Sequence, residues 1–421
     1  MSETKKKFRI AIVGGGLGGL ALAIGLHRAG VPIHVYESAH EFSEIGAGIT
    51  FGSNAIKALG LIDPALLAGF RKHFKRNPPG VWMTIRLGMD LRNPVDGDDA
   101  SRAGDLLYNQ RDEAESGYIH RARLLEEMVN LLPAGSTSFK KTLANITELP
   151  GEKGGGVELS FVDGTTATAD AVIGCDGIKG PTRSIVVGKA VPPVFTGDYV
   201  YRQLVPKEEA IKELGEERAL ASHLILAYET VMVHYPVENG AFINFVAIHN
   251  SGSTVWEGDA WVKPVPKEIM MEDLKGWDLP ILNLMSRIET PQQWALFDCP
   301  HEHRYYRNRM CLLGDAAHAA TPHNGAGAAM AMEDAYVLSQ VIGRVEDPKD
   351  LEQAFQIYDA VRRPRTQRLI QNSRISGQCW QFRYDGVEDD PVKLREQLDE
   401  RFRWIWYHDL EAELKAATGP S

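Results

Sequence analysis

Residues 8–37 read FRIAIVGGGLGGLALAIGLHRAGVPIHVYE, and they contain nearly all of a nucleotide-binding βαβ unit. A short apolar run leads into a glycine-rich turn, a helical pattern follows and ends at Gly30, and a second apolar run closes the stretch. The spacing Gly14-x-Gly16-x-x-Gly19 is weak evidence alone, but here it lies between a strand and a helix, as the dinucleotide-binding fingerprint requires. This stretch therefore predicts a Rossmann-like domain that binds a dinucleotide.

The three spaced glycines have separate expected roles. Gly14 permits the tight turn out of the first strand, Gly16 lets a pyrophosphate approach the backbone, and Gly19 lets the helix pack closely on the sheet. The phosphates would then meet free N–H groups at the helix N-terminus, where the helix dipole favours negative charge. The alternative is a glycine-rich turn that binds no ligand.

Glu37 follows the second apolar run and indicates which dinucleotide fits. A carboxylate there accepts hydrogen bonds from both hydroxyls of an adenosine ribose and repels a 2′-phosphate. The residues therefore favour FAD or NAD over NADP.

A secretory signal is a second interpretation of the same segment, because Lys5–Lys7 and Arg9 precede an apolar stretch. We reject it because the stretch is crowded with glycine, is followed by His27 and Arg28, and has no convincing small-residue cleavage pattern. No other segment holds the roughly 20 apolar residues that a membrane span needs.

Composition narrows the class of partner. The chain has 421 residues, with 46 Lys and Arg against 56 Asp and Glu, and its formal net charge of -10 argues against a nucleic-acid partner. Its four cysteines lack the spacing of metal ligands or of a redox pair, so we expect no metal site, free thiols and a reducing, cytoplasmic location.

The pattern of the chain changes along its length, and the chain is too long for one simple domain of about 100–200 residues. From about Pro192 to Leu296, short apolar or alternating runs are separated by polar stretches, which is typical of a mixed or antiparallel sheet. Helical patterns dominate residues 351–376 and 391–415. In the second of these, Phe402 and Trp406 lie on an apolar stripe, which we interpret as core or dimer contact rather than a binding site.

Two further motifs follow the glycine turn. Residues 175–183 read CDGIKGPTR, and residues 314–318 read GDAAH and precede Pro322 and the turn at residues 325–327. With the glycine turn and Glu37, they resemble the motifs of the flavoprotein aromatic hydroxylases, the single-component FAD monooxygenases related to salicylate hydroxylase and 4-hydroxybenzoate hydroxylase. The salicylate hydroxylase branch is the most similar, and the resemblance extends over nearly the whole chain to about Arg365.

This resemblance implies an α/β fold, in which a Rossmann-like FAD-binding domain of the 4-hydroxybenzoate hydroxylase type carries an inserted substrate domain with a mixed or antiparallel sheet, followed by C-terminal helices. The expected boundaries are 1–75, 116–190 and 297–370 for the discontinuous FAD-binding domain, 76–115 and 191–296 for the substrate domain, and 371–421 for the C-terminal helical segment.

The third motif implies how the flavin is held. By resemblance, Asp315 binds the ribityl chain, and the turn of Gly325, Ala326 and Gly327 faces the pyrimidine edge of the flavin and stabilises its reduced anion. Because NAD has no ribityl chain, the resemblance favours FAD over NAD.

Other positions resemble flavin contacts of the family. Arg121 resembles an arginine that contacts the flavin, Ala47 and Gly48 belong to a stretch that resembles the loop beside the ring, and Asp176 lies in a region that the family uses for both flavin and reductant. Gly180 stands where the family usually has serine, so the docking of the reductant, and the choice between NADH and NADPH, stay open.

The resemblance also implies the chemistry. In this family NADH or NADPH reduces the flavin, dioxygen adds at flavin C4a, and the resulting hydroperoxide hydroxylates an electron-rich ring. The protein must exclude water and favour the substrate as phenolate, and a buried cation lowers a phenol pKa.

Two residues of the substrate domain are the expected catalytic residues. Arg202 is the candidate partner of a substrate oxygen, and Tyr235 lies where relatives have a ring that faces the substrate cavity. The position of a histidine base in several relatives is Val231 here, and strand alternation directs the adjacent His234 away from that face.

The predicted function is an FAD-dependent, NADH- or NADPH-consuming hydroxylation of a small phenolic compound by dioxygen, salicylate-like or related. Decarboxylative hydroxylation and dearomatisation are open variants. The alternatives are a flavin dehydrogenase or reductase of the same fold that inserts no oxygen, and a flavin-bearing interaction protein. The oligomeric state, including a homodimer, is left open.

Overall fold

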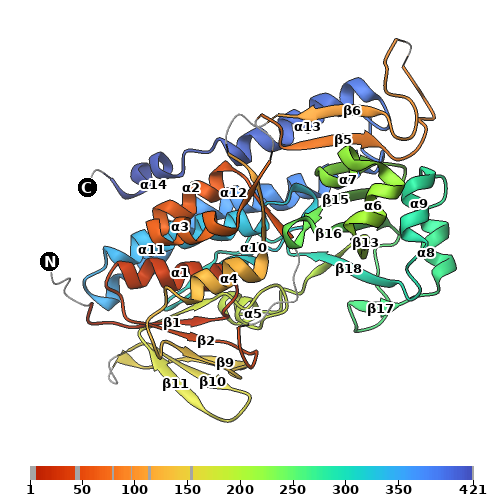
Figure 1. Cartoon of the computed structure of the whole chain (residues 1–421). Coiled ribbons are helices and arrows are strands. Elements are labelled where there is room, and N and C mark those ends of the chain that lie inside the picture. Colours follow the sequence, from red (N-terminus) through yellow and green to blue (C-terminus); the bar gives the residue numbers. More distant parts are fainter. Residues whose placement is uncertain are drawn as a thin grey trace.

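The computed structural model describes residues 6–42, 48–77, 80–95, 97–111, 115–151 and 155–419. Within these residues, four β-sheets and their helices form a mixed α/β fold, which confirms the predicted fold class (Figure 1). Among the described residues, none of the helices combines the length and the hydropathy that a membrane span requires.

The predicted βαβ unit lies at the centre of a six-stranded sheet. β1 (Ile10–Val13) pairs in parallel with β2 (Ile33–Tyr36) on one side and with β12 (Ala171–Gly174) on the other. The sheet is completed by β8 (Thr137–Ser138), β20 (Met310–Leu312) and the antiparallel edge strand β19 (Tyr306–Arg307). Every residue of β1 and β12 is buried, as expected for parallel strands that are covered on both faces.

Helices and a small sheet cover the two faces of this sheet (Figure 1). On one side, α1 (Leu17–Arg28) and α11 (Gly327–Gly343) pack against each other. On the other side lies a three-stranded sheet of β9 (Leu143–Glu148), β10 (Val157–Phe161) and β11 (Thr166–Ala169). The hairpin between β10 and β11 turns at Gly164, whose φ of 82° explains the glycine there.

A second large sheet forms the other half of the molecule (Figure 1). Its eight strands, in spatial order, are β17 (Val262–Pro264), β18 (Gln292–Asp298), β13 (Val194–Pro206), β16 (Phe242–Asn250), β15 (Thr230–Val237), β14 (His223–Leu226), β5 (Met83–Leu87) and β6 (Leu106–Gln110). All neighbours pair antiparallel except β14 and β5, so the sheet is mixed. The division of the chain into domains at fixed boundaries stays a prediction.

Four short helices cover one face of this second sheet. They are α6 (Lys207–Leu214), α7 (Glu216–Leu220), α8 (Lys267–Asp273) and α9 (Leu279–Met285). Their apolar residues form one core with Met232, Phe245 and other residues of that face. The opposite face carries Val231 and Ile248 and faces a cavity.

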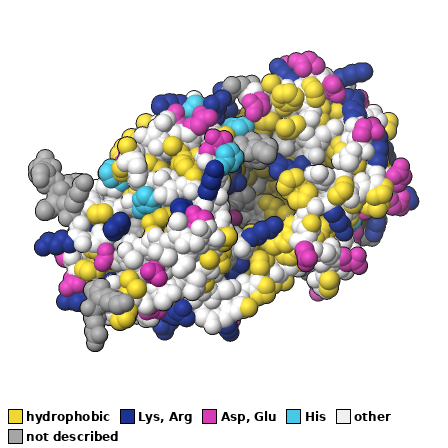
Figure 2. Space-filling model, turned by 90° about the horizontal axis from the view of Figure 1, so that it is seen from below, with side chains coloured by type: hydrophobic (Ala, Val, Ile, Leu, Met, Phe, Trp, Pro, Cys, Tyr) yellow, Lys and Arg dark blue, Asp and Glu magenta, His cyan; other side chains and the backbone are white. Residues whose placement is uncertain are grey.

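A small sheet and three helices complete the first half of the molecule and share its core. The sheet consists of β3 (Gly48–Phe51), β7 (Gly117–His120) and β4 (Lys75–Arg76), and the helices are α2 (Ser53–Ile62), α3 (Pro64–His73) and α4 (Arg121–Val129). Seen from below, the surface has a hollow near the middle of the molecule, with Lys and Arg side chains at its rim (Figure 2).

The chain ends in three helices, α12 (Leu351–Trp380), α13 (Pro391–Trp406) and α14 (Leu410–Thr418). The helix α13 packs against α12 and against β6 at the edge of the second sheet (Figure 1). The C-terminal segment therefore contacts both halves of the molecule.

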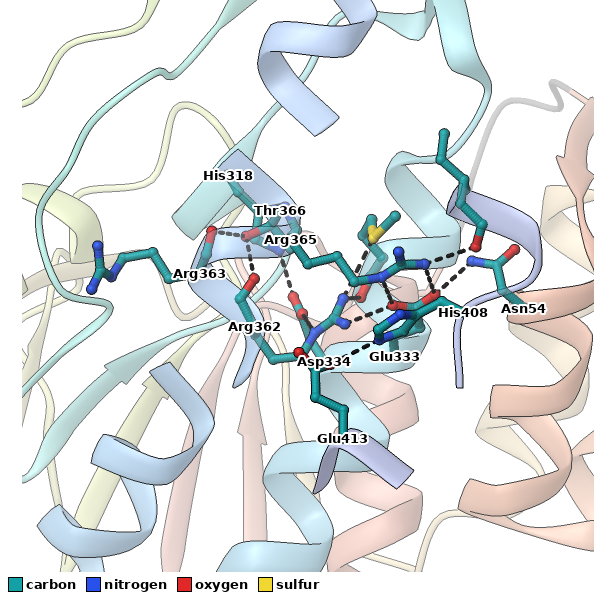
Figure 3. Close-up of polar contacts among 12 residues, drawn as sticks. Asn54, His318, Glu333, Asp334, Arg362, Arg363, Arg365, Thr366, His408 and Glu413 are labelled. Carbon is teal, nitrogen blue, oxygen red and sulfur yellow. Dashed lines mark hydrogen bonds and ion pairs between the residues drawn. The ribbon is translucent and has the colours of Figure 1, made fainter. Parts of the chain in front are cut away.

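A buried network of charges joins α11 to α12 (Figure 3). Arg362 donates from Nε to Asp334 Oδ1 at 2.7 Å and from Nη1 to Glu333 Oε2 at 2.6 Å. Arg365 donates to both oxygens of Glu333 at 2.8 and 2.9 Å, and Asn54 Nδ2 donates to Glu333 Oε1 at 2.6 Å. All four charged side chains are at most 5% exposed, so their pairing compensates their loss of water.

We expect Arg362→Leu to lower the free energy of unfolding by about 3–5 kcal/mol, because it leaves a buried carboxylate without its partner. Urea unfolding measures this change. The matched control is Arg363→Leu, one residue along α12, where the side chain is 32% exposed and pairs with Asp359 at 3.2 Å. That variant should lose less than about 1 kcal/mol. Equal losses in the two variants would contradict a structural role for the buried network.

Candidate functional site

The three sequence motifs meet at one edge of the six-stranded sheet. The glycine turn follows β1, the motif at residues 175–183 follows β12, and the motif at residues 314–318 follows β20. Since these strands are parallel neighbours, their carboxyl ends lie side by side, which is the usual ligand-binding edge of such sheets.

The geometry of the glycine turn agrees with the expected roles of its glycines. Gly14 has a φ of 103°, and a Cβ there would lie 2.3 Å from the carbonyl oxygen of Cys175. A Cβ on Gly19 would lie 2.1 Å from the carbonyl oxygen of Gly14, so only glycine allows this approach of helix to turn. In contrast, a Cβ on Gly16 would meet nothing within 4 Å. The turn therefore leaves open space where the pyrophosphate is expected.

Glu37 lies directly after β2, beside this turn. Its Oε2 accepts a hydrogen bond from the backbone N–H of Gly15 at 2.6 Å, and its Oε1 accepts one from Ala39 N–H at 2.7 Å. The carboxylate is thus held next to the glycine turn, where an adenosine ribose is expected. Of the two residues in the expected flavin loop, Gly48 lines the cavity and Ala47 lies outside the described residues.

The motif at residues 175–183 acts mainly on the protein itself. The carboxylate of Asp176 accepts hydrogen bonds from the hydroxyl and the backbone N–H of Thr182, at the start of α5 (Thr182–Val187), and Asp176 does not line the cavity. A Cβ on Gly180 would lie 1.9 Å from Cγ of Asp176, which explains why no serine stands there. Arg183 donates to the carbonyl oxygens of Ile178 at 2.6 Å and Ala316 at 3.1 Å, and so joins this motif to the next one.

The motif at residues 314–318 presents its groups to the cavity. Asp315 begins the short helix α10 (Asp315–His318) and is exposed on the cavity wall. Gly325, with a φ of 58°, and the following Ala326 and Gly327 also line the wall, where α11 begins. The N-terminus of this helix therefore points its dipole toward the position expected for the flavin.

His318, the last residue of this motif, is buried and bonded to another part of the protein. Its Nε2 bonds to Asp334 Oδ2, which also accepts the backbone N–H of Gly314 at 3.1 Å. The buried network of Figure 3 thus holds the turn that carries Asp315.

One cavity of about 480 Å³ joins the residues of these motifs to the second sheet. Its flavin-side wall includes Gly16, Arg121 and Asp315 with the turn at residues 325–327. The opposite wall is mainly apolar; besides Gln110 it includes Trp82, Met83, Leu224, Val231, Val233, Val246, Ile248, Trp380 and Phe402. An apolar chamber next to a dinucleotide cradle suits a small aromatic ring that reacts at the cofactor.

Tyr235 lies where the sequence placed it, and Arg202 does not reach the cavity. Tyr235 lines the wall, and its hydroxyl donates to the carbonyl oxygen of Gly48 at 2.9 Å. Burial raises the pKa of Tyr235. Arg202 is paired with Val246 across β13 and β16, on the cavity side of the sheet, but its side chain is exposed and is not among the lining residues.

His234 lies on the opposite face of the sheet, as strand alternation predicted. Its ring stacks between His223, at a centroid distance of 4.9 Å, and Phe245, at 5.1 Å. Burial lowers the pKa of His234 well below its ordinary value, so the ring is neutral and away from the cavity.

His323 is a wall residue that the sequence analysis missed. It lies in the 3₁₀ turn Pro322–Asn324, lines the cavity and is 6% exposed. Among the lining residues that the structure describes, only His323 and Arg121 can carry a positive charge. The signal was present, since His323 stands inside the third motif between Pro322 and Gly325.

Two aromatic wall residues from the C-terminal segment were also missed. Trp380 ends α12 and Phe402 lies on α13, and their stacked rings have centroids 6.1 Å apart. Phe402 belongs to a buried apolar cluster, as expected for the α13 stripe, and it also lines the cavity, which that interpretation left out. No local pattern distinguishes a core aromatic residue from one that lines a cavity.

Comparisons with known proteins agree with this geometry. Residues 121–373 match the model of an FAD binding domain family. The chain is 36% identical to 6-methylsalicylate 1-monooxygenase from Aspergillus terreus, over 97% of this chain and 91% of that protein. It is 34% identical to salicylate hydroxylase from Pseudomonas putida, over 99% and 96% of the two chains. A solved salicylate hydroxylase in complex with substrate aligns with a TM-score of 0.83 and 31% identity, over 99% of this chain and 100% of that one.

We expect Gly16→Val to weaken FAD binding by roughly tenfold or more, because the side chain would occupy the space left for the pyrophosphate. Titration of the FAD-free protein with FAD, followed by flavin fluorescence, measures this affinity. The control is Gly151→Val, where a Cβ also meets nothing within 4 Å and which does not line the cavity. Unchanged FAD affinity in a folded Gly16→Val protein would contradict the assigned cradle.

Proposed function

The chain belongs to the flavoprotein aromatic hydroxylases, the FAD-dependent monooxygenases, and from this membership we propose that its substrate is a small phenol with a carboxylate, of the salicylate type. Once reduced by NADH or NADPH, the bound FAD supplies the activation of dioxygen and the transfer of one oxygen atom to the ring. Cytoplasmic location stays a prediction.

The flavin-side residues fit FAD, and we propose a role for each group. The glycine turn and Glu37 hold the pyrophosphate and the adenosine ribose, Asp315 accepts hydrogen bonds from the ribityl hydroxyls, and Arg121 contacts the flavin ring. Asp176 acts indirectly, since Thr182 already occupies its carboxylate.

The observation that carries the substrate proposal is the contrast within the cavity wall. Its apolar side excludes water and accepts an aromatic ring, whereas one end carries Thr321, His323 and Asn324. Thr321 and Asn324 already have hydrogen-bond partners on α12 in Ser373 and Ser376. His323 is therefore the group whose charge we propose to act on a substrate anion, since a positive charge there favours phenolate over phenol.

The reaction test mixes the FAD-loaded protein with NADH or NADPH and with salicylate, 6-methylsalicylate, phenol or benzoate. We expect the two hydroxybenzoates to stimulate oxygen uptake, and to give a product one oxygen heavier or one that has also lost carbon dioxide. Oxygen uptake, peroxide and product mass are measured together. Oxidation of the nicotinamide nucleotide without oxygen uptake would instead favour a dehydrogenase. Stimulation by phenol alone would contradict the proposal that the substrate carries a carboxylate.

Substitutions of Arg202 and His323 should change salicylate binding to different extents. We expect His323→Gln to raise the salicylate dissociation constant by about tenfold or more, because a buried charge partner is lost. Arg202→Gln should raise it by less than about threefold, because an exposed charge is screened by solvent. Salicylate titrations followed by flavin absorbance measure both constants. A larger effect for Arg202 would restore it as the direct partner of the substrate.

A further inference from the structure

A buried carboxylate stands behind the cavity histidine. Nε2 of His323 lies 3.9 Å from Oδ2 of Asp198, and the two side chains are 1% and 7% exposed. Asp198 belongs to β13 and does not line the cavity. The pair therefore places a negative charge on the protein side of a wall residue.

Neighbouring hydroxyls fix the tautomer of His323. The hydroxyl of Ser373 donates to the carbonyl oxygen of Thr321 at 2.6 Å, and the hydroxyl of Thr321 donates to Ser373 Oγ at 3.0 Å. Since Thr321 has no second proton, His323 must donate from Nδ1 to Thr321 Oγ1, 3.0 Å away. Nε2 of the neutral ring is then a bare lone pair, and it has no hydrogen-bond partner.

The partners of Asp198 leave one oxygen for the histidine. Asn250 Nδ2 donates to Oδ1 of Asp198 at 2.8 Å, and Gln381 Nε2 donates to the same oxygen at 3.3 Å. Oδ2 faces Nε2 of His323. In the neutral ring two acceptors face each other, so a proton on Nε2 would convert this contact into an ion pair.

The position of the ring is also fixed by packing. A Cβ on Gly377 of α12 would lie 2.8 Å from Nε2 and Cε1 of His323, and the ring of Trp380 meets the imidazole edge-on at a centroid distance of 5.7 Å. Glycine within a helix is unfavourable relative to alanine. Here its small size makes room for the imidazole.

The charged groups that act on His323 oppose each other. Burial lowers the pKa of His323, Asp198 on β13 raises it, and Arg383, after α12, lowers it. Arg383 also lies 3.4 Å from Glu229 and 4.0 Å from Asp198. Ser373, Gly377 and Trp380 of α12 do not ionise in the physiological range. An empty cavity therefore holds a neutral ring, and a second anion inside it would add to the effect of Asp198.

We propose that Asp198 is a positioning residue that makes His323 take up one proton when an anionic substrate binds in the cavity. The identity of that anion rests on the proposed function. Both ring nitrogens face protein groups, so the imidazolium acts on the substrate through its charge. Substrate binding and protonation of His323 are then coupled. A neutral ligand of the same size would gain no binding affinity from the pair of Asp198 and His323.

The test measures salicylate binding to the FAD-loaded protein from pH 5 to 9, with ¹⁵N-histidine NMR of the same samples. The His323 signal is identified by its loss in His323→Gln. For the wild-type protein we expect tighter binding at lower pH and a rise of the His323 pKa on adding salicylate. Asp198→Asn keeps the shape of the side chain and should lower the pH midpoint of binding. Between the midpoint of Asp198→Asn and that of the wild-type protein, binding by the variant should weaken about tenfold for each rise of one pH unit. At pH values below both midpoints, the variant should bind salicylate as tightly as the wild-type protein does. Arg383→Gln should move the midpoint up.

The opposite signs of the two variants separate this role from a structural one. Binding that is weakened equally at every pH in Asp198→Asn, or a midpoint that moves the same way in both variants, would overturn the proposal. If Asp198→Asn does not fold, Arg383→Gln provides the test: a midpoint that moves up supports the proposal, and one that moves down or does not move overturns it. If salicylate does not bind to the wild-type protein but the His323 resonance still shifts in the variants, the proposed substrate fails and the coupling of Asp198 to His323 stands.

Discussion

The ion pairs between α11 and α12 are the constraint on which the site depends. Asp334 binds Arg362, His318 and the backbone of Gly314 together, so one buried carboxylate ties the long C-terminal helix to the turn that carries Asp315. Burial of these charges costs desolvation free energy, which is offset only when all of their partners are in place. Arg365 extends the same network to the backbone carbonyls of Trp404 and Ile405, at the end of α13. The position of the flavin-side wall and that of the C-terminal helices are therefore set together.

The cavity is built from parts that are far apart in the chain. The flavin side uses the carboxyl ends of parallel strands, where backbone N–H groups and glycines suit phosphates and an extended cofactor. The substrate side uses one face of a mixed sheet, whose alternating apolar residues exclude water. Tyr235 connects the two, since its ring packs on Gly48 and its hydroxyl bonds to the backbone there. The helices α12 and α13 close the chamber with Trp380 and Phe402.

The electrostatics of the chamber follow from this construction. A dry, apolar wall raises the cost of an isolated charge, so a positive group can act there only if the protein supplies a counter-charge. Asp198 supplies this counter-charge to His323. Among the described residues, His234 has no carboxylate partner, and it stays neutral on the other face of the sheet. Arg202 lies on the same sheet, but its side chain is exposed to solvent, so it needs no counter-charge from the protein.

The βαβ unit could be predicted from the residues alone because it depends on local constraints, and three motifs supplied the resemblance that favoured FAD and the family. Gly14, Gly16 and Gly19 are needed within one turn of chain, and their spacing is visible without a structure. The orientation of His234 was also predictable, since strand alternation is local, whereas the place of Tyr235 followed from the resemblance to the family. Packing in the folded chain set the rest: Arg202 is exposed, Asp176 is occupied by Thr182, and Phe402 lines the cavity. It alone brought Asp198 to His323, because the packing of β13 against a turn more than a hundred residues later leaves no periodic trace in either segment.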